Sequence, residues 1–168
     1  LSSGLVKASQ KSDMTITYMH PLEDQMLNEL NAQHIKYEVG SEEGVLAMLA
    51  ETFVNAEGKQ KFHAFFTELD PGYLCGESSV GEEEFETLVD ELAEEGEALL
   101  VVGADLFNHA KAINIARILG MIDRYSDLKV VMLSSEVNTL GVSLICELDE
   151  MAEGQSIGVN VQGDYTLS

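Results

Sequence analysis

The sequence contains few of the residues that build the commonest metal and disulfide sites. Its two cysteines, Cys75 and Cys146, lie far apart, and it has no tryptophan. Two isolated thiols make neither a disulfide framework nor an iron–sulfur motif, which needs four grouped thiolates, so we expect reduced thiols in a cytoplasmic protein. The four histidines share no common spacing, and none forms the H-x-x-x-H pair of a helical zinc site. We therefore expect no metal site.

Basic residues are equally scarce. Nine Lys and Arg stand against 30 Asp and Glu, and the formal charge is -21. Such a field repels phosphate backbones and anionic membrane surfaces, so we expect no nucleic-acid partner. No apolar run approaches the roughly 18 residues of a membrane-crossing helix, and no signal peptide is visible, so we expect no direct membrane insertion.

Several catalytic motifs are absent. The sequence has no G-x-S-x-G elbow, no P-loop and no strict G-x-G-x-x-G fingerprint. The acidic run that starts at Glu82 lies opposite the apolar stripe of Phe85, Leu88 and Leu92, which is typical of a solvated helix face rather than of a calcium loop. We therefore predict no catalytic residue.

What the chain does contain is enough apolar sequence for a core. Hydrophobic residues make up 45% of 168 residues, which predicts one folded domain over residues 1–168. The chain begins Leu1-Ser2-Ser3-Gly4 without an initiator methionine, and Leu5 is followed by apolar residues typical of the end of a helix. We therefore expect a fragment of a larger protein.

Strand-like and helix-like segments alternate along the chain. Strands are predicted at residues 15–19, 35–39, 98–102, 128–133 and 157–161. Between them, helices are predicted at 22–34, from Ser41 to about Phe53, around 85–92, and at 109–125, with a loop at 134–138 and a helix at 140–153 further on. This order predicts an α/β fold with a mainly parallel sheet and helices on both faces. The unbroken apolar run Ala98–Val102 is typical of a strand buried on both faces.

Two local predictions are more specific. Residues 56–81 lose their periodicity and are punctuated by Pro71-Gly72, so a long irregular connection is expected there, with at most a short helix near His63. The helix at 109–125 is expected to start at a cap on Asn108. Its inner stripe is predicted to comprise Ala112, Ile113, Ala116 and Leu119.

Three turns follow predicted strands: Met19–Pro21, Gly40–Glu42 and Asn138–Gly141. Because the ends of parallel strands meet at one edge of a sheet, we expect these turns to lie together. A glycine, a capping hydroxyl and an acid at a helix start could hold a nucleotide base or ribose. The same residues could equally serve only to turn and cap the chain.

The segment 37–53 resembles the R-P-G-T-D-A-A-L-A-L-A segment of the molybdopterin oxidoreductases, and the Met19–Pro21 turn takes the place of that superfamily's D-P-R turn. Within the superfamily, residues 138–149 and 157–164 look closest to the large iron–sulfur subunits of bacterial NADH–quinone oxidoreductase, respiratory complex I. The resemblance covers most of residues 5–168 and implies a Rossmann-like three-layer domain from the molybdopterin-oxidoreductase-like region.

The resemblance also implies where a cofactor was once held. The matching pterin-pocket positions are Gly40, Ser41, Glu42, Asn138 and Gly141. The family's aspartate is replaced by Glu42, one methylene longer, and the arginine of the first turn is missing. Complex I subunits of this type keep the fold without the molybdenum cofactor, so we expect no cofactor in this fragment, with iron–sulfur clusters bound elsewhere in the parent subunit.

The expected function follows from that resemblance. The chain would be a structural domain of an enzyme that passes electrons from NADH through iron–sulfur clusters to quinone. Its partners would be other subunits of the complex, in a peripheral arm on the cytoplasmic side of the inner membrane. Two alternatives remain: a cofactor-binding fragment of a formate dehydrogenase-like molybdenum enzyme, using Gly40, Ser41, Glu42 and Asn138, or a free-standing nucleotide-binding module.

Overall fold

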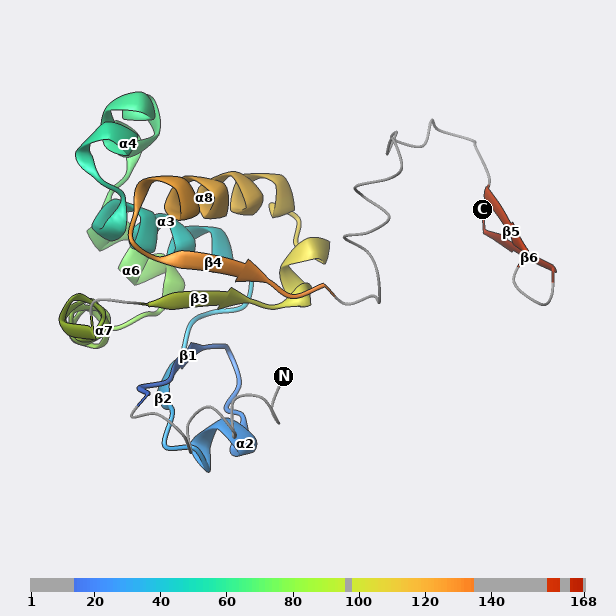
Figure 1. The fold of residues 1–168 in the computed structure, drawn as a ribbon, viewed down its shortest axis with the longest axis horizontal. Helices are drawn as coiled ribbons and strands as arrows, with labels where there is room; N and C mark the ends of the chain where they lie inside the picture. The colour runs from blue at the N-terminus through green and yellow to red at the C-terminus, as the bar shows by residue number, and fades with distance from the viewer. Residues whose placement is uncertain (1–13, 96–97, 135–156, 161–163, 168) are drawn as a thin grey trace. The chain divides into compact units, whose positions relative to one another are not determined.

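The computed structural model describes residues 14–95, 98–134, 157–160 and 164–167 (Figure 1). The chain divides into two compact units, Leu1–Leu133 and Ser134–Ser168, and each is considered by itself. The single domain expected over residues 1–168 stays a prediction.

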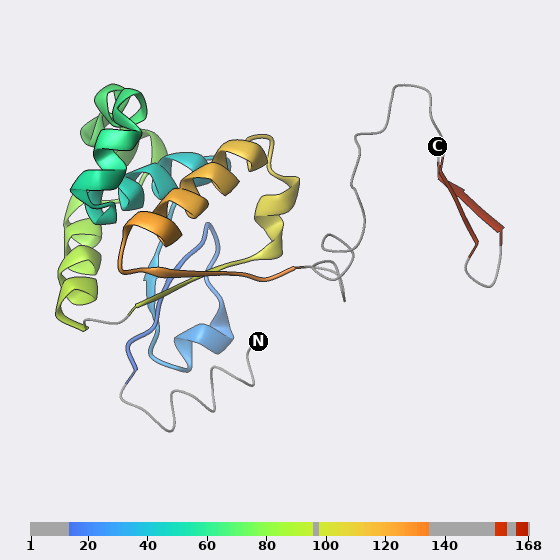
Figure 2. The same cartoon turned by 45° about the horizontal axis from the view of Figure 1, so that its top comes forward.

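The first unit contains two pairs of parallel strands (Figures 1 and 2). Strand β1 (Thr17–Met19) pairs with β2 (Gln33–Ile35). Strand β3 (Leu99–Val102) pairs with β4 (Lys129–Met132). Helices separate the strands along the chain, so the described structure combines helices with short parallel strands, as an α/β protein does.

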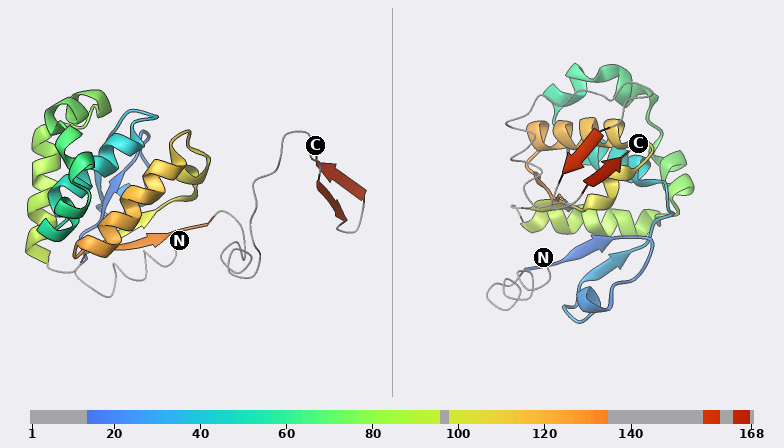
Figure 3. Two further views of the ribbon diagram at one scale, coloured as in Figure 1. Left: turned by 90° about the horizontal axis from the view of Figure 1, so that it is seen from above. Right: turned by 90° about the vertical axis from the view of Figure 1, so that its right-hand side faces the viewer.

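Two long helices form the centre of the core. Helix α3 (Glu42–Phe53) packs against α8 (Ala112–Tyr125) and against α6 (Pro71–Ser78), and Figure 3 shows α3 beside α8. Helix α7 (Glu82–Glu95) adds Leu88 to the same core. The α3 segment from Val45 to Ala50 is buried continuously, because neighbours cover the helix on more than one side. The helices predicted after Ser41 and around residues 85–92 are both confirmed.

The helix predicted at 22–34 is wrong over most of its length, since only one turn within it is helical. Helix α2 covers only Gln25–Asn28, capped by Asp24, whose carboxylate accepts from two backbone N–H groups. Asn31 has a φ of 54° in the left-handed region, where asparagine is well tolerated, and the chain leaves the helix there. Strand β2 therefore begins at Gln33 and ends at Ile35, so the strand predicted at 35–39 is wrong after its first residue.

The prediction of an irregular connection near 56–81 is also wrong. Three short helices occupy it: α4 (Ala56–Lys61), α5 (His63–Glu68) and α6. Asn55 caps α4 by accepting from Gly58 N at 2.9 Å. Asp70 caps α6 by accepting from Tyr73 N at 3.1 Å. Pro71 occupies the first turn of α6, where a missing N–H costs nothing, so these turn-like residues start helices.

The start and the inner face of α8 differ from the prediction. A short 3-10 helix, η1 (Ala104–Asn108), precedes it, and the N-cap residue is Lys111 instead of Asn108. Of the predicted stripe only Leu119 is buried, and Ile113 is 68% exposed. The buried residues of α8 are Ile115, Ile118, Leu119, Met121, Ile122 and Tyr125.

Strand β3 is confirmed, but its burial on both faces is not. Val102 is 4% exposed and faces the core, whereas Leu99 is 60% and Val101 40% exposed. Val131 of β4, which lies opposite Val101, is also 40% exposed. Within the described residues, the β3–β4 pair is therefore covered on one face only.

The second unit contains two described strands. Strand β5 (Ile157–Asn160) confirms the strand predicted at 157–161, and it pairs antiparallel with β6 (Asp164–Leu167). The predicted loop at 134–138 and helix at 140–153 lie, apart from Ser134, outside the described residues.

Candidate functional site

The turn from β2 into α3 contains three of the predicted pterin-pocket positions. Gly40 has a φ of 94°, a conformation that side chains with a Cβ rarely adopt, so the turn itself requires glycine. Ser41 occupies the N-cap position of α3, but its hydroxyl makes no capping bond and donates instead to Glu38 O. The serine therefore fixes the turn rather than presenting its hydroxyl to a ligand.

The third position, Glu42, is paired within the chain. Its Oε2 lies 3.1 Å from Nε2 of His109, and both side chains are only 14% exposed. His109 lies between η1 and α8, where the chain runs from β3 into the next helix. Glu42 Oε2 is buried and accepts no aligned hydrogen bond in the described structure, and the contact is an ion pair only when His109 is protonated. The pairing joins the start of α3 to the start of α8.

The other ring nitrogen of His109 is also in use. Its Nδ1 accepts a hydrogen bond from Lys111 N at 2.9 Å. An accepting Nδ1 carries no proton, so the neutral ring holds its proton on Nε2, on the side of Glu42. A general base needs a free nitrogen within reach of the proton that it removes. The arrangement therefore positions His109 and leaves neither nitrogen for acid–base work.

A second acid of the same helix turn makes a parallel contact. Asn114 Nδ2 donates to Glu43 Oε1 at 2.7 Å. Glu42 and Glu43 are the two acids in the first turn of α3, where the helix dipole favours negative charge. Both acids thus hold α3 to residues at the beginning of α8, and we call Glu42, Glu43, His109 and Asn114 the α3–α8 latch.

Tyr37 is a partly buried phenol close to this latch. Burial, together with the carboxylates of Glu42 and Asp105, raises the pKa of Tyr37 to about 12. Each of these causes disfavours the phenolate. Tyr37 is therefore a neutral phenol throughout the physiological range.

The described residues do not fit a pterin guanine dinucleotide. Such a group needs an accessible carboxylate and free hydrogen-bonding groups, but Glu42 is turned to His109 and Ser41 to Glu38. Only the backbone of Gly40 remains open, because a Cβ built there meets nothing within 4 Å. Asn138 and Gly141 lie outside the described residues.

The turn at Met19–Pro21 is likewise closed on itself. Nδ1 of His20 accepts from Leu22 N at 3.0 Å, and His34 Nε2 lies 2.7 Å from His20 O. In the part of the chain that the structure describes, no hydrogen bond joins this turn to Gly40–Glu42. Sequence reasoning missed His109 and Asn114, whose only signal was that they lie between β3 and the first turn of α8, near the edge where the β2 turn was also expected.

Other features of the described part of the chain do not point to a ligand. An open hollow at the start of α7 is lined by Ser79, Gly81 and Glu82–Glu84, none of which belongs to the latch. Within the described ranges, no group of His, Cys, Asp and Glu is placed to hold a metal ion. Among those same residues, no helix combines the length and apolarity needed to cross a membrane.

Comparison with known proteins adds no relative from which a role could be transferred. No protein-family model matches the sequence, and a search of curated proteins finds no significant match.

Proposed function

We propose that this chain is a structural domain, built as a Rossmann-like three-layer α/β fold. In this domain, side chains at the end of a strand hold two helices together instead of binding a ligand. The observation that supports this role is the pairing of Glu42 with His109 at 3.1 Å. A carboxylate that follows a strand of an α/β fold is placed to accept a hydrogen bond from a ligand hydroxyl, such as that of a ribose. Here it joins two helices of the same chain.

The family assignment rests on the resemblance of residues 37–53, 138–149 and 157–164 to the large iron–sulfur subunit of NADH–quinone oxidoreductase. In that setting, the domain supports the cluster-bearing part of the subunit and contacts other subunits of the peripheral arm, on the cytoplasmic side of the inner membrane. The parent enzyme transfers electrons from NADH to quinone, and this domain contributes no reacting group.

A second candidate is a cofactor-holding domain of a molybdenum-dependent oxidoreductase. Gly40 is the observation that favours it, because the space beside its backbone is open and glycine allows close approach of a ligand. For such a ligand to be gripped by a carboxylate, Glu42 would have to leave His109. The two candidates therefore differ in whether the Glu42 carboxylate is free to bind a ligand.

Guanine-nucleotide binding separates the two candidates. GMP, a fragment of the pterin dinucleotide, would be titrated into the purified chain, with AMP as the matched control. A structural domain should show no binding and no change in its thermal midpoint, even at about 1 mM nucleotide. Saturable binding of GMP but not AMP, abolished by Glu42→Gln, would establish the cofactor-holding role instead.

Membership of the respiratory complex needs its own experiment. Membranes of the source cells would be solubilised gently and separated by native electrophoresis, and the chain located with an antibody. It should migrate with the band that oxidises NADH. Migration only as a small free protein would contradict the assignment to the complex.

A further inference from the structure

Cationic side chains gather over aromatic rings where α4 and α5 meet the end of α8. All the cation–π contacts found in the described ranges lie here. Their cation-to-centroid distances are 5.6 Å for Lys59 over Phe66, 5.8 Å for Lys61 over Phe62, 5.4 Å for Lys61 over Tyr125 and 5.8 Å for Arg124 over Tyr125. We call Lys59, Lys61, Phe62, Arg124 and Tyr125 the basic–aromatic patch.

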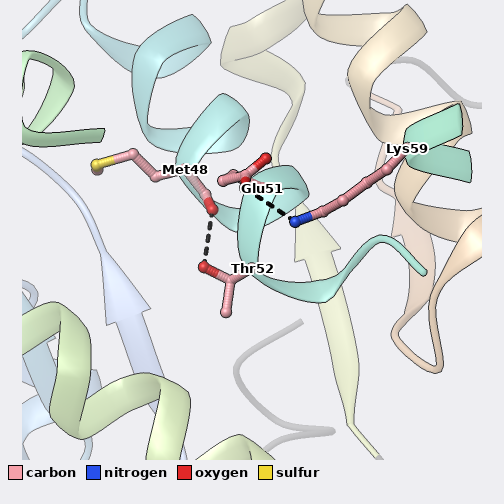
Figure 4. A network of polar contacts seen from close by, with 4 residues as sticks. All are labelled: Met48, Glu51, Thr52 and Lys59. Carbon is pink, nitrogen blue, oxygen red and sulfur yellow. Dashed lines mark hydrogen bonds and ion pairs between the residues drawn. The ribbon is translucent and has the colours of Figure 1, made fainter. Parts of the chain in front are cut away.

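Two of the three cations in the patch have no carboxylate partner among the described residues. Lys59 is paired with Glu51 at 2.9 Å (Figure 4). Lys61 instead donates to the phenol oxygen of Tyr125 at 2.8 Å. In the described structure, neither Lys61 nor Arg124 forms an ion pair, although acids outnumber bases in the chain by 30 to nine. Within the described ranges, the patch therefore carries two unpaired positive charges on the surface of a strongly acidic protein.

The pKa of Tyr125 and the exposure of the patch are both consistent with two unpaired, accessible cations. The pKa of Tyr125 is lowered, chiefly because Lys61 donates a hydrogen bond to the phenol oxygen, with a further contribution from Arg124. Tyr125 itself is 6% exposed, but Lys61 and Arg124 are exposed and Phe62 is 37% exposed. Two cations and an apolar ring are thus accessible above a buried phenol.

Acids on the same elements weaken the positive field only in part. Asp123 precedes Arg124, but its Oδ1 accepts from Val130 N at 3.1 Å and is held toward β4. Glu57 is exposed in the first turn of α4, whereas Lys59 and Lys61 occupy the last turn. At physiological salt, charges more than about 8 Å apart are largely screened, so an incoming group at the patch responds mainly to its nearest cations.

We propose that the basic–aromatic patch docks an acidic segment of a partner protein, with carboxylates on Lys61 and Arg124 and an apolar side chain against Phe62. Arginine and aromatic side chains are the groups that dominate such contacts. The rest of the acidic surface repels the same segment, which restricts docking to one place and one orientation. This goes beyond the proposed structural role and does not depend on the family assignment.

The test uses the whole chain labelled with nitrogen-15 and an octaglutamate peptide that ends in one leucine. Adding the peptide should shift amide signals of residues 56–68 and 122–126, and these shifts should weaken as salt is raised. Lys61→Gln and Arg124→Gln should each reduce affinity by about tenfold. Arg124→Gln leaves the Lys61–Tyr125 hydrogen bond in place, so it tests binding even where Lys61→Gln loosens α4.

Lys129→Gln is the matched control, because Lys129 is an exposed lysine on β4 that forms no ion pair with any residue the structure describes. It should bind the peptide as the parent chain does. The proposal is overturned by an absence of shifts at about 1 mM peptide, or by equal losses of affinity in the Lys129 and Lys61 variants. Shifts of the same size caused by inorganic phosphate alone would also overturn it, because the site would then be one for small oxyanions.

Discussion

Gly58 lies directly against Tyr125, so that a Cβ built on Gly58 would lie 2.7 Å from the tyrosine Cβ and 2.5 Å from Cγ1 of Val54. The backbone is joined at the same place, because Asn55 N donates to Tyr125 O at 2.7 Å. The cap on Asn55 and the close approach at Gly58 together place α4 on the end of α8. This junction also places Lys61 over the Tyr125 ring.

Gly58→Ala should destabilise the protein, although alanine is the better helix former. Both clashing neighbours are buried, at 4% and 6% exposure for Val54 and Tyr125, and cannot move away freely. Overpacking of this kind costs about 1–3 kcal/mol, which outweighs a propensity gain of about 1 kcal/mol. Urea denaturation followed by circular dichroism measures the difference.

Gly120→Ala is the control, because Gly120 is also inside a helix but a Cβ there meets nothing within 4 Å. It should raise stability by about 0.5–1 kcal/mol. If both alanine variants are stabilised, the packing of α4 on α8 described above is incorrect.

The helices of this chain were easier to predict than their junctions. Helices α3, α7 and α8 were predictable because each contains apolar residues at helical spacing over a dozen or more positions. Pro71-Gly72 indicates a loop in the sequence, whereas Pro71 in fact lies in the first turn of α6, and Asn55 and Asp70 cap α4 and α6, because residue types found in loops also start helices. Their short helices have too few residues for periodicity to distinguish the two readings.

The inner face of α8 shows a second limit. Apolar residues surround much of this helix, including Ile113, Ile115 and Ile118, so the sequence alone allows more than one buried stripe. Helix α8 packs on α3, Ile115 and Ile118 are buried, and Ile113 remains 68% exposed. At the candidate site, Glu42 was predictable from its place at a helix start. His109 was not, because its approach to Glu42 depends on tertiary structure.

The α3–α8 latch gives a prediction about His109. His109→Ala should lower the free energy of unfolding by about 1–3 kcal/mol, because it leaves the buried Oε2 of Glu42 without the ring nitrogen that lies 3.1 Å from it. Adding Glu42→Gln to this variant should restore part of the loss, since an uncharged amide costs less to bury. A double-mutant cycle from urea denaturation measures the coupling.

Glu57→Gln is the matched control for the Glu42 change. Glu57 lies in the first turn of α4, as Glu42 lies in the first turn of α3, but it is exposed. Replacing the Glu57 carboxylate by an amide should change the free energy of unfolding by less than about 0.5 kcal/mol, with no coupling to His109. Additive effects of Glu42→Gln and His109→Ala would mean that the two side chains do not interact.

The raised pKa of Tyr37 leads us to expect a loss of stability at high pH. The phenol has a pKa of about 12 in the folded protein and an ordinary value of 10.0. Below the ordinary value both states hold the proton, so stability is unaffected. As pH rises from about 10 to about 12, the unfolded chain releases its proton first and stability falls, by an amount of order 2 kcal/mol.

Tyr37→Phe isolates this effect from the other groups that titrate at high pH. The difference in unfolding free energy between Tyr37→Phe and the parent chain should stay flat up to about pH 10 and then change in favour of the variant. Tyr73→Phe is the control, because Tyr73 is 63% exposed. A flat difference for Tyr37→Phe across the whole range would show that the phenol is freely hydrated.

The two faces of β3 give the last prediction, because Val101 and Val102 are adjacent valines with opposite surroundings. Val102 is 4% exposed and belongs to the core, whereas Val101 is 40% exposed on the outer face. Val102→Ala should destabilise the chain by more than about 1 kcal/mol, since it removes buried methyl groups and leaves a cavity. Val101→Ala should cost less than about 0.5 kcal/mol. Equal losses in urea denaturation would mean that the outer face of β3 is covered in solution, as the apolar run Ala98–Val102 first indicated for a strand in a parallel sheet.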